Sequence, residues 1–387
     1  MNIMFVAIFP IVPYYGGIQR VTDILCQEMQ KRGHNVIFVA YDRKERMSYE
    51  SFSAPQYYVE TKNRSETEIR QELLKIVEQN KTEYVICQGL GNSKFISLLP
   101  KKLKIVTVCH TQPYPRESLT RSRILWTTPK TFKDFFVKYF FYCFPSVAIN
   151  YSASVENKLQ QIAFDISDKV CYISERFFYR VKKHLPNIEE EKLVAINNPA
   201  IKPTIKFKEE EKENIVIWVG RIRNSSKNTI DFIKAWRDVF QHHPDWKAII
   251  IGAGPSMKDN EKYIRKHNIS NITFVGKRDD IFKFYKKAKI SVVTSWSESW
   301  SMVVIESMAY GCLPIVYDTY ESIHDIIKNR GNGIICEPNP KALATEINKY
   351  IEDKESRENM TLEAYKSLDR FSVEKTVDLW EALFKKM

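Results

Sequence analysis

Two glutamates eight positions apart, Glu298 and Glu306, are the residues of this chain whose type and spacing most favour chemistry. An apolar run at 290–294 predicts a buried parallel strand, and the spacing over 301–310 predicts a helix with Gly311 as its stop signal. Glu298 is then expected in the loop at the carboxyl end of a strand, and Glu306 in the second turn of the next helix. Ligands bind at that edge of open α/β sheets.

This arrangement suits a phosphorylated sugar. Backbone amides at the helix start, at Ser301, Met302 and Val303, can face a phosphate. The two carboxylates can accept hydrogen bonds from sugar hydroxyls. The alternative is structural, with Glu298 as a helix-capping carboxylate and Glu306 as a solvated helix residue, because acidic residues are favoured near helix starts.

A second candidate group follows an apolar run at 214–220. It delivers Gly220, Arg221 and Lys227 to the carboxyl end of another predicted strand. Two cations there can neutralise a diphosphate without a metal ion. The chain contains no Asp-x-Asp triplet, which metal-dependent nucleotide-sugar enzymes commonly use. We therefore expect no metal and no other cofactor.

Gly16 and Gly17 stand directly before a predicted helix in the first half of the chain. Without side chains, their backbone can approach a phosphate or a sugar closely. Tight turns also need glycine for purely structural reasons, so the pair alone is weak evidence. Neither half carries Gly-x-Gly-x-x-Gly after its first strand, which argues against a dinucleotide site.

The elements that must position these residues alternate between strands and helices in both halves, which predicts two parallel sheets with helices on both faces. In the first half, strands are predicted at 3–9, 35–41, 83–88, 104–109, 146–150, 169–173 and 192–197, with helices at 18–32, 66–79, 131–143 and 175–184. In the second half, strands are predicted at 214–220, 247–252, 272–276, 290–294, 314–317 and 333–336, with helices between them and another at 340–352.

Length and composition fit a soluble two-domain protein. A chain of 387 residues is too long for one ordinary core, and 44% apolar with 27% charged residues is a common globular composition. The charged, proline-bearing stretch 199–213 predicts the linker. No apolar run reaches the roughly 18 residues of a membrane span, and the amino terminus lacks a basic leader, so we expect a cytoplasmic protein. The seven cysteines are scattered without a C-x-x-C pattern, which predicts neither disulfides nor a zinc site.

Taken together, these residues resemble the family 4 glycosyltransferases, retaining enzymes of the GT-B fold with two Rossmann-like domains facing across a cleft. The Glu298 to Glu306 spacing followed by 309–316 is the most specific part of the likeness. Further support comes from the Gly-Arg-…-Lys element at 220–227, the turn at 250–255, the Gly16-Gly17 loop and the segments 168–175 and 195–199. The resemblance implies an acceptor-binding, membrane-facing domain at 1–198, a linker at 199–213, a nucleotide-sugar domain at 214–370 and a C-terminal helix at 371–387 that packs back on the first domain.

The resemblance also implies roles for single residues. Arg221 and Lys227 would hold the donor diphosphate and stabilise the departing charge. Glu298 would contact the donor sugar, and Glu306 would bind the ribose hydroxyls. His110, after the predicted strand 104–109, matches the family's histidine that reaches the donor sugar, although a lone histidine there is more often structural. The implied catalytic set is Glu298, His110, Arg221 and Lys227, and the implied donor-binding set is Gly16, Gly17, Gly220, Arg221, Lys227, Glu298, Ser301, Met302, Val303 and Glu306.

Two departures from the family pattern are visible. The usual Glu-Gly-Phe-Gly is here Glu298-Ser-Trp-Ser301, so serines replace two glycines that allow close backbone approach. The spacing from Arg221 to Lys227 is one residue longer than the commonest form, which implies a slightly bulged loop.

The implied reaction moves a hexose or N-acetylhexosamine, with its anomeric configuration kept, from a nucleoside-diphosphate sugar. UDP is expected from its frequency in the family, and the acceptor is expected to be a saccharide or lipid-linked saccharide of bacterial surface polysaccharide or lipopolysaccharide synthesis. In the family the attack is from the front face, and the leaving phosphate helps deprotonate the acceptor. Two alternatives stay open: a nucleotide-sugar 2-epimerase of the same fold, and a non-catalytic sugar-nucleotide-binding protein.

The net charge of +12 is concentrated in one region. Between Lys94 and Lys138, ten basic residues stand against Glu117 and Asp134, a net charge of +8. Residues 129–145 then interleave lysines with many Phe and Tyr residues, which predicts a helix resting on an anionic membrane through 115–145. A buried helix is the alternative. No nucleic-acid-binding module is recognised, so no nucleic-acid partner is expected. We expect a protein peripheral to the inner face of the cytoplasmic membrane.

Overall fold

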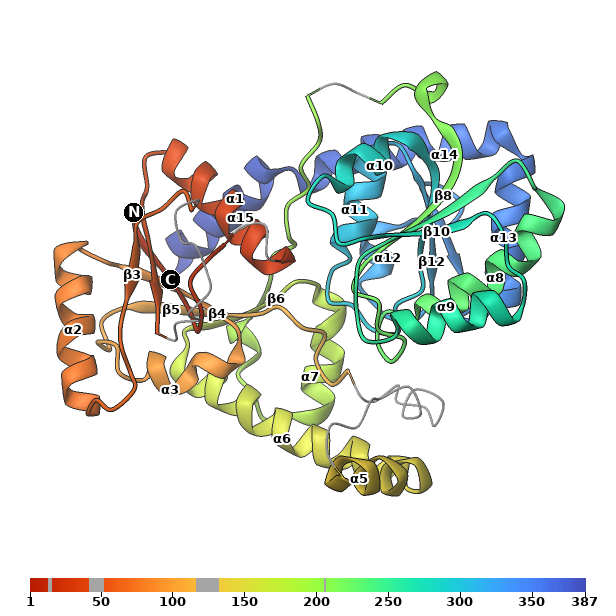
Figure 1. The fold of residues 1–387 in the computed structure, drawn as a ribbon. Coiled ribbons are helices and arrows are strands. Elements are labelled where there is room, and N and C mark those ends of the chain that lie inside the picture. The colour runs from red at the N-terminus through yellow and green to blue at the C-terminus, as the bar shows by residue number, and fades with distance from the viewer. Residues whose placement is uncertain (13–15, 42–51, 116–131, 205–206) are drawn as a thin grey trace. The chain divides into compact units, whose positions relative to one another are not determined.

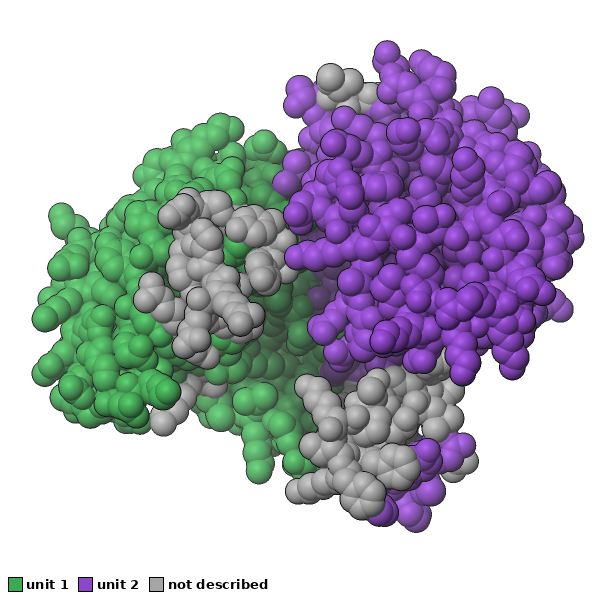
Figure 2. All heavy atoms as spheres, viewed as in Figure 1, with its two compact units in different colours: residues 1–114, 150–199, 373–387 green, residues 115–149, 200–372 purple. Residues whose placement is uncertain are grey.

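The computed structural model describes residues 1–387 except 13–15, 42–51, 116–131 and 205–206 (Figure 1). The chain divides into two compact units (Figure 2). Unit 1 comprises residues 1–114, 150–199 and 373–387, and unit 2 comprises residues 115–149 and 200–372. Each unit is built around one parallel sheet.

Unit 1 contains a seven-stranded sheet with the order β3-β2-β1-β4-β5-β6-β7, and every neighbouring pair is parallel. The order reverses between β1 and β4, the position where ligands bind at the carboxyl edge of such sheets. Its inner strands are almost wholly apolar, as expected where helices cover both faces. The strands are β1 (Asn2–Ala7), β2 (Asn35–Ala40), β3 (Gln56–Tyr58), β4 (Tyr84–Gln88), β5 (Lys104–Cys109), β6 (Lys169–Tyr172) and β7 (Leu193–Ala195).

The long helices of unit 1, α1, α2 and α15, each bury an apolar face. Met4 and Val6 of β1 pack in one core with Leu73 of the second helix. The C-terminal helix packs on the first helix, and Arg32 Nη1 pairs with Asp378 Oδ1 at 2.6 Å. The end of the chain therefore lies in the same unit as its beginning. The helices are α1 (Gly17–Lys31), α2 (Glu66–Gln79), η2 (Leu90–Asn92), α3 (Ser93–Ile96), η3 (Glu175–Phe177), α7 (Phe178–His184), η4 (Glu190–Lys192) and α15 (Val373–Lys386).

Unit 2 contains a six-stranded parallel sheet with the order β10-β9-β8-β11-β12-β13. Alternate residues of β8 point to opposite faces. Val216 and Trp218 pack in one core with the helices α8 and α13, and Ile215 and Ile217 pack in another core with Tyr285 of α10. The strands are β8 (Glu213–Val219), β9 (Lys247–Ile251), β10 (Ile272–Gly276), β11 (Ala288–Val293), β12 (Leu313–Tyr317) and β13 (Ile334–Cys336).

The remaining helices belong to unit 2, except that the boundary between the units falls inside α6. They are α5 (Phe132–Cys143), α6 (Pro145–Ile166), η5 (Glu209–Glu211), α8 (Thr229–His242), α9 (Met257–Lys266), α10 (Ile281–Lys287), α11 (Met302–Ala309), α12 (Ile323–Ile326), α13 (Pro340–Glu352), α14 (Lys354–Ser367) and η6 (Leu368–Phe371). In the described residues, no helix is both long and apolar enough to cross a membrane.

The connecting segment 199–213 is anchored to unit 2. Buried Lys212 donates through Nζ to the carbonyl oxygens of Ala288 (2.8 Å), Tyr310 (2.9 Å) and Tyr285 (3.2 Å). One ammonium thus ties the segment to the elements around β11. Without Lys212, these carbonyl groups would lose a charged hydrogen-bond donor.

The predicted fold class, two Rossmann-like parallel-sheet domains of the α/β type, is confirmed. One predicted strand is wrong, because residues 146–150 form part of α6. A short apolar run cannot be distinguished from a buried helix segment by periodicity alone, and Pro145 at the first helical position favours a helix start. The edge strand β3 was not predicted, since three residues carry too little pattern.

Candidate active site

The segment 220–228 follows β8 and carries both predicted cations. Ile222 N donates to Ala253 O at 3.1 Å, so the segment lies against the turn after β9. A Cβ atom on Gly252 would come within 1.8 Å of Gly220 O. Only glycine lets these two backbones approach so closely, which gives the turn at 250–255 a packing role.

Lys227 and Glu298 form an ion pair at the carboxyl edge of the unit 2 sheet. Their side chains are 32% and 16% exposed, so solvent and ligands reach both. The backbone holds them together, since Thr294 Oγ1 donates to Lys227 O at 3.1 Å and Trp296 N donates to Ser226 O at 2.8 Å. The loops after β8 and β11 are therefore joined at this point.

Arg221 lies on the same segment with an exposed side chain. Among the described residues, its guanidinium makes no hydrogen bond or ion pair. The segment ends at Asn228, whose φ of 51° is left-handed and suits asparagine. The edge thus offers one cation paired with a carboxylate and one open to an anionic ligand.

The start of α11 provides hydrogen-bond donors beside this pair. Ser301 precedes the helix, is 2% exposed and accepts through its carbonyl from Val304 N at 3.0 Å. The amides of Met302 and Val303 precede this first intrahelical bond and have no partner within the helix. Within the described part of the chain, the buried Ser301 Oγ also has no hydrogen-bond partner. An anion at this helix start would find several donors.

Glu306 is half-buried in the second turn of α11, the position expected from the sequence. The helix ends at Ala309, and Gly311 follows with a φ of +73°, as its predicted stop signal requires. The structure therefore places Glu298 in the loop and Glu306 on the helix. Their assigned roles stay predictions.

The sequence Ser299-Trp300-Ser301 fits the backbone without strain. Ser301 has φ −77° and ψ 92°, and no positive φ occurs at Ser299, so neither position requires glycine. Trp300 is buried, and its ring meets Phe371 edge-on at 5.1 Å between centroids. The large aromatic residue anchors the loop to unit 2. The departure from Glu-Gly-Phe-Gly is therefore compatible with an ordered site.

Tyr320, which sequence reasoning missed, lies buried close to this site. Burial raises the pKa of its hydroxyl well above the ordinary range, and the charge of Glu298 adds to this effect. The hydroxyl lies beside Ser301, but the two do not meet hydrogen-bond geometry. A neighbouring cavity of about 390 Å³ is lined by Trp296, Asp318, Thr319, Tyr320, Glu321, His324 and Pro338. No sequence signal distinguished this loop after β12.

In unit 1, His110 follows β5 and hydrogen-bonds through Nε2 to Oε1 of Gln88, the last residue of β4. Burial lowers the pKa of His110 to about 4, so its ring is neutral at neutral pH. With Nε2 protonated toward Gln88, Nδ1 is left as an acceptor, and it has no partner among the described residues. Gln88 was not predicted, although its place at the end of the neighbouring strand was a usable signal.

Gly16 directly precedes α1, and Gly17 is the first residue of that helix. The φ of Gly16 is 174°, an extended value open to any residue, and a Cβ there would meet no atom within 4 Å. Neither backbone conformation nor packing therefore requires glycine at position 16. The free space leaves room for the close ligand approach predicted from the sequence. Residues 13–15, just before it, lie outside the described part of the chain.

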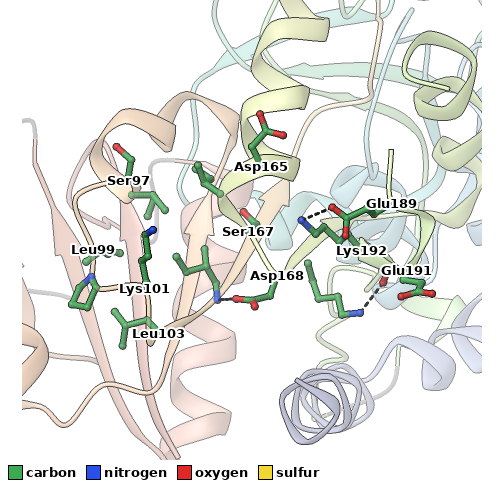
Figure 3. A pocket seen from close by; sticks show the side chains of 15 residues that line it. Ser97, Leu99, Lys101, Leu103, Asp165, Ser167, Asp168, Glu189, Glu191 and Lys192 are labelled. Atoms are coloured by element: carbon green, nitrogen blue, oxygen red, sulfur yellow. Dashed lines mark hydrogen bonds and ion pairs between the residues drawn. The ribbon is translucent and has the colours of Figure 1, made fainter. Parts of the chain in front are cut away.

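A cavity of about 640 Å³ in unit 1 lies at the opposite edge of the sheet from His110, where β5 and β6 begin (Figure 3). Most of its charged side chains are engaged with their neighbours, including Asp165 and Asp168. Lys192 pairs with Glu189 at 3.0 Å, and Lys169 donates to the Glu191 carbonyl at 2.7 Å. These contacts leave little demand for a charged ligand, so we do not assign the site to this cavity.

The described residues contain no group of three or more His, Cys, Asp or Glu side chains that could hold a metal ion. All seven cysteines are free, and six of them are buried. Burial raises the pKa of Cys87 to about 12, which makes its thiol unreactive.

Comparison with known proteins supports the class that the sequence resembles, the glycosyltransferases. The sequence model of Glycosyltransferase Family 4 matches residues 15–200, and the model of Glycosyl transferases group 1 matches residues 202–367. The structure of Anabaena HepE in complex with UDP and glucose has a TM-score of 0.73 and 15% identity, with both chains covered completely. This chain therefore has the GT-B fold.

Curated relatives are similarly distant. The GalNAc-alpha-(1->4)-GalNAc-alpha-(1->3)-diNAcBac-PP-undecaprenol alpha-1,4-N-acetyl-D-galactosaminyltransferase of Campylobacter jejuni is 27% identical, over 55% of this chain and 56% of its own length. The N-acetyl-alpha-D-glucosaminyl L-malate synthase of Bacillus anthracis is 21% identical over 96% of this chain and 94% of its own length. The chain spans about half the length of the first curated relatives it matches. With both halves matched by their family models, the chain belongs to the family 4 glycosyltransferases.

Proposed function

We propose that this protein is a retaining glycosyltransferase that moves a hexose or N-acetylhexosamine from a nucleoside-diphosphate sugar to an acceptor hydroxyl. The observation that carries the proposal is the ion pair of Lys227 and Glu298 next to the α11 start, where Ser301 Oγ is buried without a partner in the described structure. A diphosphate needs cations and backbone donors, and a sugar needs a carboxylate acceptor. This edge provides all three.

In the proposed mechanism the diphosphate leaves into a preorganised positive site. Arg221 and Lys227 stabilise the charge that grows on the leaving oxygen, and the amides of α11 assist them. Glu298 then accepts hydrogen bonds from the donor sugar, and Glu306 from the ribose. Positioning and charge stabilisation supply the rate enhancement, and the leaving phosphate takes the proton of the acceptor from the same face.

His110 is proposed to contact the donor sugar from unit 1. As a neutral imidazole it can accept a hydrogen bond at Nδ1 while Nε2 stays engaged with Gln88. Gly16 and Gly17 would bring the backbone of unit 1 close to the phosphates. No metal ion is required in this scheme, because Arg221 and Lys227 take the role that a divalent cation has elsewhere.

UDP is the proposed carrier, and the HepE structure with UDP and glucose supports this choice. The proposed acceptor is a saccharide or a lipid-linked saccharide of bacterial surface polysaccharide or lipopolysaccharide synthesis. The name of the Campylobacter relative, which includes a polyprenyl diphosphate carrier, supports the lipid-linked form. We propose that the protein works in the cytoplasm at the inner face of the cytoplasmic membrane, held by the region 115–145. Residues 116–131 of that region lie outside the described structure.

A thermal-shift screen of nucleoside-diphosphate sugars, with and without EDTA, tests donor binding. Ligands that bind the native state raise the melting temperature by mass action. We expect stabilisation by one sugar nucleotide, unchanged by EDTA. Loss of the shift in EDTA would overturn metal independence, and no shift with any donor would favour the non-catalytic alternative.

Product analysis then separates transfer from epimerisation. A 2-epimerase converts the bound sugar nucleotide without an acceptor, whereas a transferase releases the nucleoside diphosphate when an acceptor is added. We expect acceptor-dependent release, with the anomeric configuration of the donor kept in the product. Conversion of the donor sugar without any acceptor would favour the epimerase.

A further inference from the structure

Helix α6, whose course Figure 1 shows, exposes apolar side chains along its length. Val147, Tyr151, Val155 and Ile162 are 44%, 64%, 45% and 42% exposed. Residues four apart lie on the same side of an α-helix, so the first three follow one another along one face. Ile162 continues the same face. A helix of a soluble protein normally turns such a face toward the core.

Helix α5 exposes aromatic rings immediately before this stripe. Phe136, Tyr139, Phe140 and Phe144 are 60%, 45%, 50% and 54% exposed. The rings of Phe140 and Phe144 are in contact, with centroids 5.3 Å apart. Only Phe144 separates α5 from α6 in the chain. The apolar surface therefore continues from one helix into the next along the sequence.

Charge is absent from the stretch that carries these rings, except at Phe136, which stands between Asp134 and Lys138. No Asp, Glu, Lys or Arg occurs from Tyr139 to Val155. On the amino-terminal side, the interval from Lys94 to Lys138 carries ten basic residues against two acidic ones. An uncharged aromatic surface next to a basic segment complements a bilayer with anionic headgroups, which offers negative charge at its surface and hydrocarbon beneath.

We propose that the α5–α6 stripe, defined as Phe136, Phe140, Phe144, Val147, Tyr151 and Val155, inserts into the headgroup region of an anionic membrane. The inference deepens the proposed function and rests on it, because it assigns the surface that holds the enzyme at a lipid-linked acceptor. Phe and Tyr favour the boundary between headgroups and acyl chains. Insertion of the part from Phe140 to Val155 needs no desolvation of charge, because that interval carries no charged residue. The surface extends past the predicted helix 131–143 to the middle of α6.

Flotation with phosphatidylcholine vesicles, with and without phosphatidylglycerol, tests the stripe. We expect the full-length protein to float with the anionic vesicles. The variants F136S/F144S and Y151S should bind more weakly, by about tenfold for each aromatic ring removed, because each loses a ring from the apolar phase. These positions are exposed, so their substitution should leave the melting temperature nearly unchanged.

Tyr179 on α7 is 76% exposed and provides the matched control. Y179S removes the same ring from an exposed helix outside the stripe, and it should float like the wild type. Unchanged flotation of F136S/F144S and Y151S would overturn the proposal, as would a wild type that does not bind anionic vesicles. Self-association abolished by the same variants, without vesicle binding, would assign the stripe to a second copy of the chain instead.

The failure of this inference can be distinguished from failure of the proposed function. Release of nucleoside diphosphate to a soluble saccharide acceptor should be the same in wild type and F136S/F144S, because neither phenylalanine belongs to the donor site. Vesicle binding without donor turnover would leave the stripe in place and remove the enzyme assignment. Turnover without vesicle binding would keep the enzyme assignment and overturn the proposed role of the stripe.

Discussion

The carboxylate of Glu298 is paired with Lys227, the cation that a donor diphosphate would need. In the described structure the pair is partly exposed. A diphosphate entering this edge must share or displace the carboxylate, and both groups are negative. The ion pair therefore sets a modest electrostatic cost on binding UDP alone. With a sugar nucleotide, the hydroxyls of the sugar can hydrogen-bond to Glu298 and offset that cost.

The variant E298Q tests this competition. It keeps the shape of the side chain and removes its charge, so UDP should bind about threefold more tightly, in line with partly exposed ion pairs. Turnover of the sugar nucleotide should fall, because the amide is a weaker acceptor for sugar hydroxyls. Calorimetric titration with UDP and steady-state kinetics measure the two effects. E355Q, at an exposed position of α14, is the control. Weaker UDP binding in E298Q would contradict the competition.

His110 makes stability depend on pH in a defined direction. Burial lowers its pKa to about 4, below the value of about 6.5 for the unfolded chain. Between these values the unfolded state binds a proton that the native state does not bind. The stability contributed by the neutral ring is complete above about pH 6.5 and is lost as the pH falls toward 4, by up to about 3 kcal/mol.

Urea unfolding near pH 7 and near pH 4 should show this loss in the wild type. H110Q removes the titrating group, so its free energy of unfolding should fall by clearly less over the same range. H242Q, at an exposed position of α8, should behave like the wild type. Equal pH dependence in H110Q and wild type would show that His110 titrates normally.

At the scale of elements, Lys212 anchors the connecting segment to α10, β11 and the residue after α11. Its ammonium donates to three carbonyl groups within 3.2 Å, two of them in buried contacts. K212M should lower the free energy of unfolding of unit 2 by about 2 to 4 kcal/mol, because it removes a charged donor from these carbonyl groups, two of which keep only the weaker thiol donor of Cys312 among the contacts described. Chemical denaturation measures the change, and K286M, at an exposed position of α10, is the matched control. A loss no larger than that of K286M would mean that the anchor contributes nothing.

The elements around the candidate site could be predicted because their signals are local. The apolar run of β11, the helical spacing of α11 and the stop at Gly311 are all contiguous in sequence. The contacts that shape the site are not contiguous. Gly252 serves the close approach of Gly220, and Trp300 packs on Phe371 seventy-one positions later. Such pairings exist only after the chain folds, so the sequence could suggest the loops but not their contacts.

Helix α6 shows where prediction from the sequence failed for an element rather than for a contact. Its residues 146–150 match a short buried strand, but the helix continues for twenty-two residues and exposes much of one face. Sequence patterns assume that an apolar run is buried. An exposed apolar stripe breaks that assumption, and only the three-dimensional structure revealed it. The error therefore points to the surface that we assign to the membrane.

At the scale of the whole molecule, the proposed chemistry is divided between two units that fold around separate sheets. Unit 2 carries Arg221, Lys227 and Glu298, and unit 1 carries His110 and Gly16. The alternation of strands and helices in each half of the chain predicted the two sheets. The family resemblance implied which candidate residues each half carries. Binding of the donor nucleotide is expected to depend on unit 2, whereas turnover is expected to depend on residues of both units.

The most direct test of the account is the rate of nucleoside-diphosphate release from a sugar nucleotide in the presence of acceptor, compared among wild type, R221A and K227A. Each variant removes a preorganised charge that would stabilise the leaving group, so each kcat should fall about 10²- to 10³-fold, equivalent to roughly 3 to 4 kcal/mol of transition-state stabilisation. The folded state of each variant is checked by its melting temperature. A wild type that turns over while both variants keep its rate would contradict the assignment of this edge as the donor diphosphate site.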